Sequence, residues 1–348
     1  MNGARLEIDL AAFRENVRIL SQLVRPATTM LAVKANAYGH GMLPMARAAL
    51  EAGADSLAVL EVPAALALRE AGISAPILAW LHGVDTDFAA AVRTKVDLGI
   101  STLQELEAVI AASSDGVPGR VHLKIDTGLH RNGARPEDWP ALVAAAVSAE
   151  RVGTISIVGL WSHLADASPE DDAEALEKFL AAVEVARSLG CTAGLLHLAA
   201  SSAGIREPEA RLGMVRFGIA AYGISPFDDE SGAQLGLTPV MSMRAPILGL
   251  AGGIATIGLG SADGIQIPAI GAAEVAIRGT RFTIASLDID SLTVDVSDSA
   301  IEVGEEVTVF GSGAAGEATA EQWAVWGATV GDEIVARAGD RLPRIYLG

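Results

Sequence analysis

The chain has 348 residues, of which 51% are hydrophobic and 20% are charged, and its formal net charge is −18 at pH 7. This length and composition predict a folded protein with one large core or two domains of ordinary size. Because the acidic residues are spread along the chain, nucleic acids and anionic membranes are disfavoured as partners, and a small-molecule ligand is expected.

Targeting signals and cysteine chemistry are also disfavoured. No apolar stretch approaches the ~20 residues of a membrane helix, and the opening segment MNGARLEIDL has no apolar core of a signal peptide, so we expect a cytoplasmic protein. The single cysteine, Cys191, has no intrachain partner for a disulfide and lies in no metal-ligand spacing. We therefore expect neither a redox role nor a metal site.

The first part of the chain alternates between strand-like and helix-like patterns. Amphipathic, alanine-rich stretches separate eight short apolar runs, which lie at 31–37, 56–60, 76–80, 96–101, 120–126, 156–163, 194–200 and 215–223. Continuous apolar strands that alternate with helices predict a parallel sheet, and a count of eight predicts a closed (β/α)₈ barrel. An open doubly wound sheet is the alternative, but it would carry a glycine-rich loop after its first strand, where this chain has a lysine.

After about residue 230 the pattern changes. Segments such as FTIASLDIDSLTVDVSD and EEVTVFGSG alternate with period two and are rich in Val, Ile and Thr, which predicts a mostly antiparallel β domain. We therefore expect a barrel domain over 8–225 and a C-terminal β domain over 235–348, joined by the polar segment SPFDDESGAQ at 225–234. Residues 1–7 are candidates to join the second domain.

Polar residues cluster at the predicted strand ends, where barrel enzymes carry their functional side chains. The residues at or just after these ends are Lys34, Lys124, Arg131, His163, Ser201 and Arg216. Each has an ordinary explanation by itself, because a lysine can extend its charge to solvent and a lone histidine is more often structural than catalytic. Their convergence on one rim favours a functional site, and a partly desolvated lysine there suits Schiff-base chemistry with carbonyl compounds.

The lysine motif AVKANAYGHG (32–41) resembles the pyridoxal-phosphate motif of the alanine racemases. The resemblance continues in order through LKIDTGLHR, WSHLADA, HLAASSAG, VRFGIAAYG and GSADG to RLPRIY, so it covers almost the whole chain. It implies a barrel that binds pyridoxal 5′-phosphate, a C-terminal β domain, and an isomerase that interconverts L- and D-alanine or a related amino acid. It also implies a head-to-tail homodimer, in which each β domain covers the active site of the partner subunit.

The resemblance assigns roles to the cofactor-binding residues. Lys34 resembles the lysine that binds the cofactor covalently and acts as a base on one face of the substrate's α-carbon. Tyr38 resembles the phosphate-binding tyrosine, and Ser201 with the backbone N–H groups of Gly218 and Ile219 would complete the phosphate site.

The remaining matches surround the cofactor ring. Arg216 resembles the arginine that faces the pyridine nitrogen, and His163 would support it by hydrogen bonding. Arg131 would hold the cofactor's phenolic oxygen or the substrate carboxylate. Lys124 matches a position that is carbamylated in many relatives. By resemblance, Lys34, Arg131 and His163 are thus the expected catalytic residues.

The face that the β domain contributes departs from the family. Relatives carry a catalytic tyrosine, the second base, in a loop shortly before the segment that reads IATIGLGSADG here, whereas this chain has only ILGLAGG between Pro246 and Ile254. We expect that this loop and its tyrosine are deleted. Asp290 is retained, but Ser261 and Asp332 replace tyrosines, Ser286 an arginine, Ile289 a methionine, Ser168 an acidic residue and His130 a glycine.

Racemisation needs an acid/base group on each side of a planar carbanion, so the missing tyrosine leaves three hypotheses open. The first is a racemase in which another group, with His130 and Asp332 as candidates, replaces the tyrosine. The second is a one-base pyridoxal-phosphate enzyme that acts on another amino acid, and the third is a non-catalytic homologue that binds the cofactor. A metal-dependent barrel hydrolase and a sugar-phosphate aldolase are weaker, because His163 and His197 alone do not supply a metal-ligand set.

Overall fold

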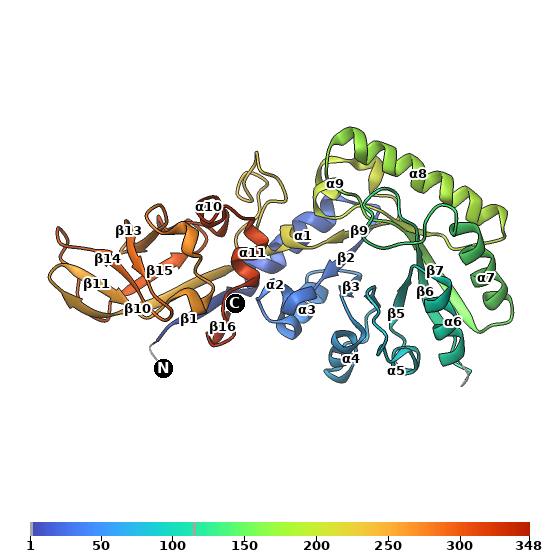
Figure 1. The fold of residues 1–348 in the computed structure, drawn as a ribbon, viewed down its shortest axis with the longest axis horizontal. Helices are drawn as coiled ribbons and strands as arrows, with labels where there is room; N and C mark the ends of the chain where they lie inside the picture. The colour runs from blue at the N-terminus through green and yellow to red at the C-terminus, as the bar shows by residue number, and fades with distance from the viewer. Residues whose placement is uncertain (1–2, 114–115) are drawn as a thin grey trace. The chain divides into compact units, whose positions relative to one another are not determined.

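A computed structural model describes residues 3–113 and 116–348 (Figure 1). The chain forms two compact units. One, the barrel unit, contains residues 20–34 and 53–218, and the other, the sheet unit, contains residues 1–19, 35–52 and 219–348. Within the described residues, none of the helices combines the length and apolarity of a membrane span.

The barrel unit contains eight parallel strands in one continuous sheet, with the order β8-β7-β6-β5-β4-β3-β2-β9. The strands are β2 (Thr28–Ala32), β3 (Ser56–Val59), β4 (Ile77–Ala79), β5 (Asp97–Ile100), β6 (Gly119–Lys124), β7 (Ile155–Trp161), β8 (Leu195–His197) and β9 (Met214–Phe217). Two backbone hydrogen bonds join β8 to β9, from Gly213 N to Leu196 O at 3.0 Å and from Arg216 N to Ala199 O at 3.1 Å. The predicted (β/α)₈ barrel is therefore confirmed.

Helices cover the outside of these strands (Figure 1). They are α4 (Val62–Glu70), α5 (Phe88–Arg93), α6 (Leu103–Ala112), α7 (Trp139–Arg151), α8 (Pro169–Ser188) and α9 (Ser201–Arg206). Capping residues mark where two of these helices begin. Thr102 and Glu105 form a capping box at the start of α6, and Ser168 caps α8 by accepting a hydrogen bond from Asp171 N.

The prediction of a strand over 31–37 was wrong. Strand β2 ends at Ala32, and α2 (Lys34–Tyr38) is a turn in which Ala35, Asn36 and Ala37 have φ values of 50°, 53° and 55°. The backbone of this turn bonds to itself, through Gly39 N to Ala35 O and Gly41 N to Asn36 O, rather than to a neighbouring strand. The left-handed conformation is unfavourable for residues with a Cβ. The alanines and the asparagine of this segment therefore did not predict a left-handed turn.

The last predicted barrel strand is also shorter than expected. Strand β9 ends at Phe217, and Ile219–Tyr222 form a 3₁₀ turn instead of continuing the predicted run to residue 223. Strand β8 likewise covers three residues of the predicted 194–200.

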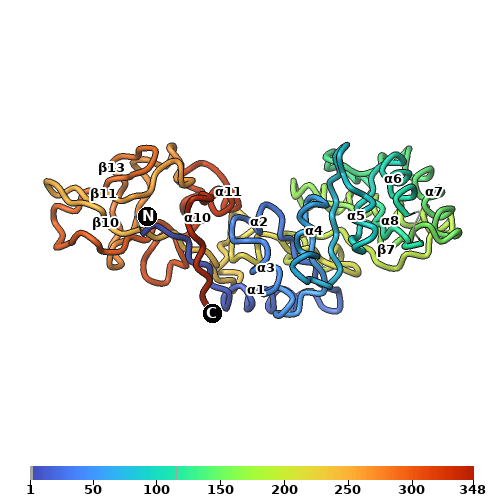
Figure 2. The backbone as a smooth tube through the Cα atoms, turned by 90° about the horizontal axis from the view of Figure 1, so that it is seen from below, coloured from blue at the N-terminus to red at the C-terminus, as the bar shows by residue number. Residues whose placement is uncertain are grey.

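The sheet unit contains a second sheet with the order β11-β14-β13-β12-β15-β10-β1-β16. Its strands are β1 (Arg5–Asp9), β10 (Met241–Ala251), β11 (Ile254–Ile257), β12 (Glu274–Ile277), β13 (Thr280–Leu287), β14 (Leu292–Asp295), β15 (Glu306–Phe310) and β16 (Arg344–Leu347). All pairs are antiparallel except β1 with β16, so the predicted antiparallel β structure is confirmed. Figure 2 shows the N-terminal segment in blue. Its strand β1 pairs with β10, although the two strands lie far apart in the sequence.

Four helices also belong wholly or largely to the sheet unit, namely α1 (Leu10–Leu23), α3 (Met42–Glu51), α10 (Ala320–Trp326) and α11 (Gly331–Ala336). The core of the sheet follows from alternation along β10, where Met241, Met243, Ala245 and Ile247 are buried and the residues between them are half-buried.

Candidate active site

Lys34 lies two residues beyond the end of β2, at the carboxyl-terminal side of the barrel strands. The preceding residue is anchored to the next strand, because Val33 N donates a hydrogen bond to Ala58 O at 2.8 Å. The side chain of Lys34 is half-buried. Its charge is one of several that lower the pKa of His163, so the two residues share one electrostatic environment.

Arg216, on β9, makes hydrogen bonds to four neighbouring residues of the site. Its Nη1 donates to His197 Nδ1 at 3.0 Å, and its Nη2 donates to Ser162 O at 2.9 Å, Leu198 O at 2.8 Å and His163 Nδ1 at 2.9 Å. Burial, with the charge of Arg131 in second place, lowers the pKa of Arg216 to about 9. Among the described residues, the Nε–H of Arg216 meets no hydrogen-bond acceptor, so this donor remains for a ligand.

His163 directly follows Ser162 beyond the end of β7. Burial lowers its pKa well below the usual value, and the neighbouring charges of Arg216, Arg131, Lys124 and Lys34 act in the same direction. The imidazole is therefore neutral at pH 7 and accepts a hydrogen bond from Arg216 through Nδ1.

Lys124 is the last residue of β6 and is only 3% exposed. Its ammonium group donates to Asn132 Oδ1 and lies 4.5 Å from the centroid of the Trp161 ring. Burial, followed by the charges of Arg216 and Arg131, lowers the pKa of Lys124 to about 7. The side chain is thus close to half-protonated at neutral pH, which is unusual for a lysine.

Basic side chains dominate this end of the barrel unit. Arg131 is exposed, and its charge acts on Lys124, His163 and Arg216. The one carboxylate that opposes these charges at Lys124 is Asp126. A cluster of this sign suits an anionic, electron-rich ligand.

A hydroxyl group and a glycine amide lie close together at the next strand ends. Ser201 is the first residue of α9, directly beyond β8, and its hydroxyl accepts a hydrogen bond from Gly218 N at 3.1 Å. Both residues are buried, and Ile219 follows Gly218 in the chain. The hydroxyl and the backbone amides leave no bulky side chain between a ligand and the backbone.

Tyr38 and Ile219 belong to the sheet unit. The Tyr38 ring is 7% exposed and packs on Tyr222 at 4.9 Å between centroids. Burial raises the pKa of Tyr38, as does the charge of Asp332, so its phenol stays protonated and can donate. The next residue must be a glycine, because a Cβ on Gly39 would lie 2.3 Å from Val335 O.

Three residues of the site were missed by sequence reasoning. His197 was considered only as a metal ligand, and neither His122 nor Asp97 was singled out. The structure links all three to Arg216 by hydrogen bonds. A signal was present in the sequence, because His122 and Lys124 are two residues apart on one strand and therefore share a face.

The segment expected to have lost a loop is a tight hairpin in the sheet unit. Ala251 on β10 pairs with Ile254 on β11, so only Gly252 and Gly253 connect the two strands. Their φ values are 58° and 82°, as a two-residue hairpin turn with positive φ at both positions requires. In this structure the turn is complete and contains no polar side chain.

The other substituted positions are solvated or locally bonded. Ile289 is 72% exposed, and the Ser286 hydroxyl bonds to Thr293 Oγ1 at 2.7 Å. Asp332 is half-buried in α11. In the barrel unit, the His130 ring is exposed and its Nδ1 lies 3.0 Å from Asp126 Oδ2.

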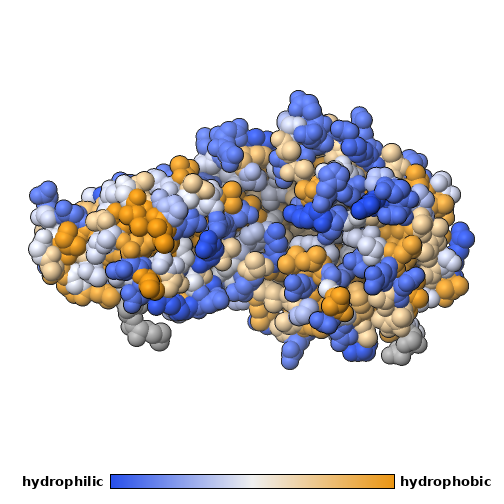
Figure 3. Space-filling view, viewed as in Figure 1, coloured by the Kyte–Doolittle hydropathy of each residue, from blue (hydrophilic) through white to orange (hydrophobic). Residues whose placement is uncertain are grey.

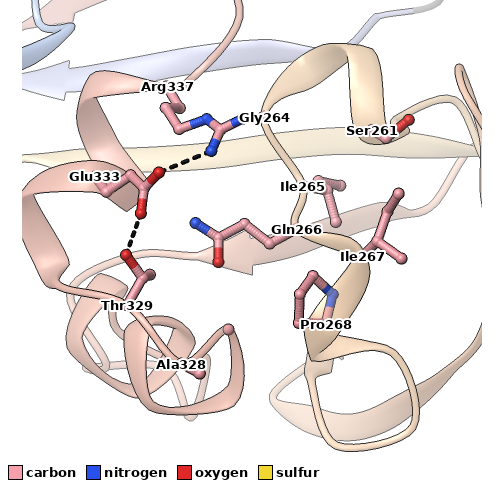
Figure 4. Close-up of a pocket in the computed structure, with 11 residues that line it drawn as sticks. Ser261, Gly264, Ile265, Gln266, Ile267, Pro268, Ala328, Thr329, Glu333 and Arg337 are labelled. Atoms are coloured by element: carbon pink, nitrogen blue, oxygen red, sulfur yellow. Dashed lines mark hydrogen bonds and ion pairs between the residues drawn. The ribbon is translucent and has the colours of Figure 1, made fainter.

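Ser261 lines a separate pocket of about 350 Å³ within the sheet unit (Figure 4). Gln266, Ile267 and Pro268 lie along one side of the pocket and Thr329, Glu333 and Arg337 along the other. Glu333 binds both Arg337 and Thr329, so the charged groups of this pocket are satisfied by one another.

The fold and these residues define a class, a (β/α)₈-barrel protein with a lysine–arginine site at its strand ends and a second, antiparallel domain. The model of the alanine racemase N-terminal domain matches residues 8–226, and that of the C-terminal domain matches residues 250–346. The chain therefore belongs to the alanine racemase family.

Similar proteins span the whole chain. The alanine racemase of Frankia casuarinae is 41% identical, with 98% of this chain and 95% of that protein covered. The alanine racemase of Beutenbergia cavernae is 39% identical over 370 positions, with 99% and 98% covered. The structure of alanine racemase from Streptomyces coelicolor A3(2) is 38% identical, matches with a TM-score of 0.96, and covers 100% of this chain and 99% of that chain.

Proposed function

We propose that this chain is a pyridoxal-phosphate-dependent amino-acid racemase of the alanine racemase type, acting on alanine or a related amino acid without the family's usual second base. The observation that carries the proposal is the hydrogen-bonded cluster around Arg216, because a buried arginine whose Nε–H meets no acceptor among the described residues, with Lys124 as a neighbouring base, suits an anionic aromatic cofactor. Similarity to proteins named alanine racemase over almost the whole chain supports the activity.

The residues present fit pyridoxal 5′-phosphate. The Nε–H of Arg216 is a donor for the ring nitrogen. By resemblance, the Ser201 hydroxyl and the amides of Gly218 and Ile219 would bind the phosphate, which would replace Ser201 Oγ as the acceptor of the Gly218 N–H. By resemblance, Tyr38 would bind the phosphate and Lys34 the aldehyde carbon. When bound, the cofactor would supply an electron-withdrawing ring that acidifies the substrate's α C–H bond.

The side chains around this site have distinct tasks in the proposal. The Lys34 amine takes and returns the α-proton on one face of the substrate, and Arg131 holds the cofactor's phenolic oxygen or the substrate carboxylate. Arg216 keeps the ring nitrogen unprotonated, because a permanent cation repels a second proton. The neutral imidazole of His163 accepts from Arg216 and so holds its guanidinium in place.

Three observations support the absence of the second base. The β10–β11 connection has two glycines and no loop. The chain has three tyrosines, of which Tyr38 and Tyr222 are buried and Tyr346 donates to His40 O at 3.1 Å. The 370-position alignment with the Beutenbergia cavernae protein exceeds the 348 residues of this chain by 22, so this chain lacks segments that the relative has.

His130 is the replacement base that the geometry favours. Asp126 Oδ1 accepts from the backbone N–H groups of Gly128 at 3.0 Å and His130 at 3.1 Å, which fixes the carboxylate beside His130 Nδ1. No described residue hydrogen-bonds its Nε2, so that nitrogen can exchange protons, and Arg131 is its neighbour in the chain. Asp332 is the weaker candidate, because a carboxylate near a phosphate would repel it.

A homodimer is part of the proposal. The sheet unit exposes large apolar side chains, including Ile267 at 65%, Ile289 at 72% and Val325 at 78%, and Figure 3 shows apolar residues gathered on its visible face. Exposed apolar surface of this kind suits association with a second copy in the family's head-to-tail manner. Sedimentation at micromolar concentration is expected to give twice the 35.7 kDa chain mass.

The experiment that tests the activity is deuterium wash-in at the α-carbon. L- and D-alanine are incubated separately in heavy water with the protein and pyridoxal phosphate, followed by proton NMR and chiral analysis. Exchange with inversion would support racemisation, and exchange of one enantiomer without inversion would favour the one-base alternative.

The controls separate the chemistry from the cofactor. Lys34→Ala should abolish exchange, whereas Lys178→Ala, an exposed lysine paired with Glu174, should not. Absence of exchange together with tight cofactor binding would favour the third hypothesis, a non-catalytic cofactor-binding homologue.

A further inference from the structure

Arg216 is a buried cation without a carboxylate partner. Among the described residues, no acidic side chain lies within ion-pair distance of its guanidinium, and its acceptors are two backbone carbonyls and two neutral imidazoles. Burying a charge without a counter-charge is strongly unfavourable unless hydrogen bonds replace the lost water. The structure must therefore stabilise this cation in another way.

One of the two imidazoles begins a buried chain of hydrogen bonds. His197 Nε2 lies 2.9 Å from His122 Nδ1, and His122 Nε2 lies 3.4 Å from Asp97 Oδ2. Asp97 is the first residue of β5, His122 lies in the middle of β6 and His197 ends β8. The chain thus crosses the barrel interior from the amino ends of the strands to the rim where Arg216 lies.

The chemistry of the two ends fixes the direction of every bond. An arginine can only donate, so His197 Nδ1 must accept and its Nε2 must carry the proton. His122 Nδ1 must then accept, and its Nε2–H points to Asp97, which as a carboxylate can only accept. Both histidines are thereby confined to one neutral tautomer, the Nε2–H form.

The electrostatics of each member agree with this arrangement. Burial keeps the pKa of His197 well below its usual value, and the charge of Arg216 acts in the same direction. Burial disfavours the charge of Asp97, but the hydrogen bonds from His122 and Arg120 and the charge of Arg120 outweigh this and lower its pKa. The arrangement therefore has a cation at one end, an anion at the other and neutral imidazoles between.

The surrounding residues are shaped for these rings. Trp161 stacks on His197, with 5.4 Å between centroids and 10° between planes, and donates from its indole nitrogen to His122 O at 3.2 Å. A Cβ on Gly159 would lie 3.0 Å from His122 Nδ1, so a glycine there leaves room for the ring.

We infer that Asp97, His122 and His197 are positioning residues that hold Arg216 in one orientation and leave its Nε–H available to the cofactor's ring nitrogen. They do so through the one-way chain of hydrogen bonds that starts at Arg216 and ends at Asp97. The role toward the cofactor depends on the proposed function, whereas the tautomers of the two histidines do not.

The first test is NMR of the histidine-¹⁵N-labelled wild-type chain without cofactor. We expect a pyridine-type Nδ1 and a pyrrole-type Nε2 for both His122 and His197. A protonated Nδ1 on His197 would overturn the inference whatever the activity of the enzyme.

The second test uses Asp97→Asn and His122→Phe. Asp172→Asn and His82→Phe are the matched controls, because Asp172 is another buried carboxylate of the barrel unit and His82 is a half-buried histidine outside the chain of bonds. In the two test variants we expect a shifted His197 Nε2 resonance, because the acceptor side of its N–H bond is altered, while Nδ1 still accepts from Arg216. We also expect about tenfold weaker pyridoxal-phosphate binding by fluorescence titration, a change of about 1.4 kcal/mol. The controls should leave this resonance unshifted and change affinity less than about twofold.

The outcomes are distinguishable from a failure of the proposed function. Folded test variants with an unshifted His197 Nε2 resonance and unchanged affinity would reduce these residues to ordinary packing and overturn the inference. If the test variants do not fold, the wild-type tautomers still decide. If the wild-type chain does not bind pyridoxal phosphate, the proposed function and the role toward the cofactor fail, even where the tautomers are as expected.

Discussion

The barrel unit and the sheet unit differ in how their polar side chains are bonded. The rim of the barrel unit carries a cluster of polar groups around Arg216, whose Nη1 and Nη2 donate to two imidazoles and two backbone carbonyls. In the sheet unit, the positions expected to differ from the family carry two glycines in a closed hairpin, an exposed isoleucine and short hydroxyl side chains.

This difference shows why residues that bind a ligand and residues that take part in the reaction can change independently. Buried polar networks lose stability when one member is removed, because every remaining partner is left unsatisfied. Exposed side chains and hairpin loops can change with little effect on folding. The barrel site is therefore tied to the fold, whereas the face of the sheet unit is free to change with the reaction.

The largest expected effect tests whether the barrel rim is chemically active. Lys34→Ala should lower α-proton exchange by roughly 10³-fold or more, because no other group replaces the covalent lysine. Borohydride treatment of the protein with pyridoxal phosphate, followed by peptide mass spectrometry, should locate the cofactor on Lys34 in the wild-type chain. Cofactor found mainly on Lys124 or Lys178 instead would contradict the assignment.

The second prediction tests the proposal that His130 of the barrel unit acts as the second base. If His130 is the second base, His130→Asn should lower inversion by roughly 10²–10⁴-fold while one-face exchange by Lys34 persists. Chiral analysis and deuterium wash-in on the same samples separate the two rates. Glu137→Gln, at the same exposed rim, is the control, and equal inversion in His130→Asn and the wild type would exclude His130.

The third prediction concerns the buried lysine of the barrel rim. The pKa of Lys124 is about 7 in the folded chain and 10.5 when solvated. Between these values the unfolded chain binds more protons, so stability from this residue rises with pH, and the full penalty is present below pH 7. Lys124→Met should therefore raise the melting temperature relative to the wild type most below pH 7, with the gain shrinking toward pH 10.

Thermal unfolding of the cofactor-free proteins across this pH range is the measurement. Lys178→Met should show no pH-dependent difference, because Lys178 is exposed. A difference between Lys124→Met and the wild type that stays constant with pH would argue against the depressed pKa of Lys124.

The smallest expected effect concerns a family departure that is purely structural. Ser168 caps α8 through the backbone of Asp171, so Ser168→Ala should lower the free energy of unfolding by about 1 kcal/mol and leave cofactor affinity unchanged. Urea unfolding measures the first and fluorescence titration the second. A marked loss of cofactor affinity in this variant would place Ser168 in the site instead.

Much of the fold followed from periodicity, because it reports burial directly. Eight apolar runs separated by amphipathic helices became β2–β9, and period-two segments became β12–β15. Strand β1 was not predicted, because its partner strands β10 and β16 lie far away in the sequence. The turn at 34–38 was predicted as strand, because small residues fit several conformations.

The sequence by itself determined the barrel, the antiparallel domain, and a rim of basic residues after the strands, since these depend on local pattern and on the parallel direction of the strands. Only the tertiary structure decided that Asp97, His122 and His197 form one chain of bonds to Arg216. These residues come from three separate strands, and their relation depends on ring orientation and proton position. Sequence distance carries no information on either, because both are set by packing across the barrel interior.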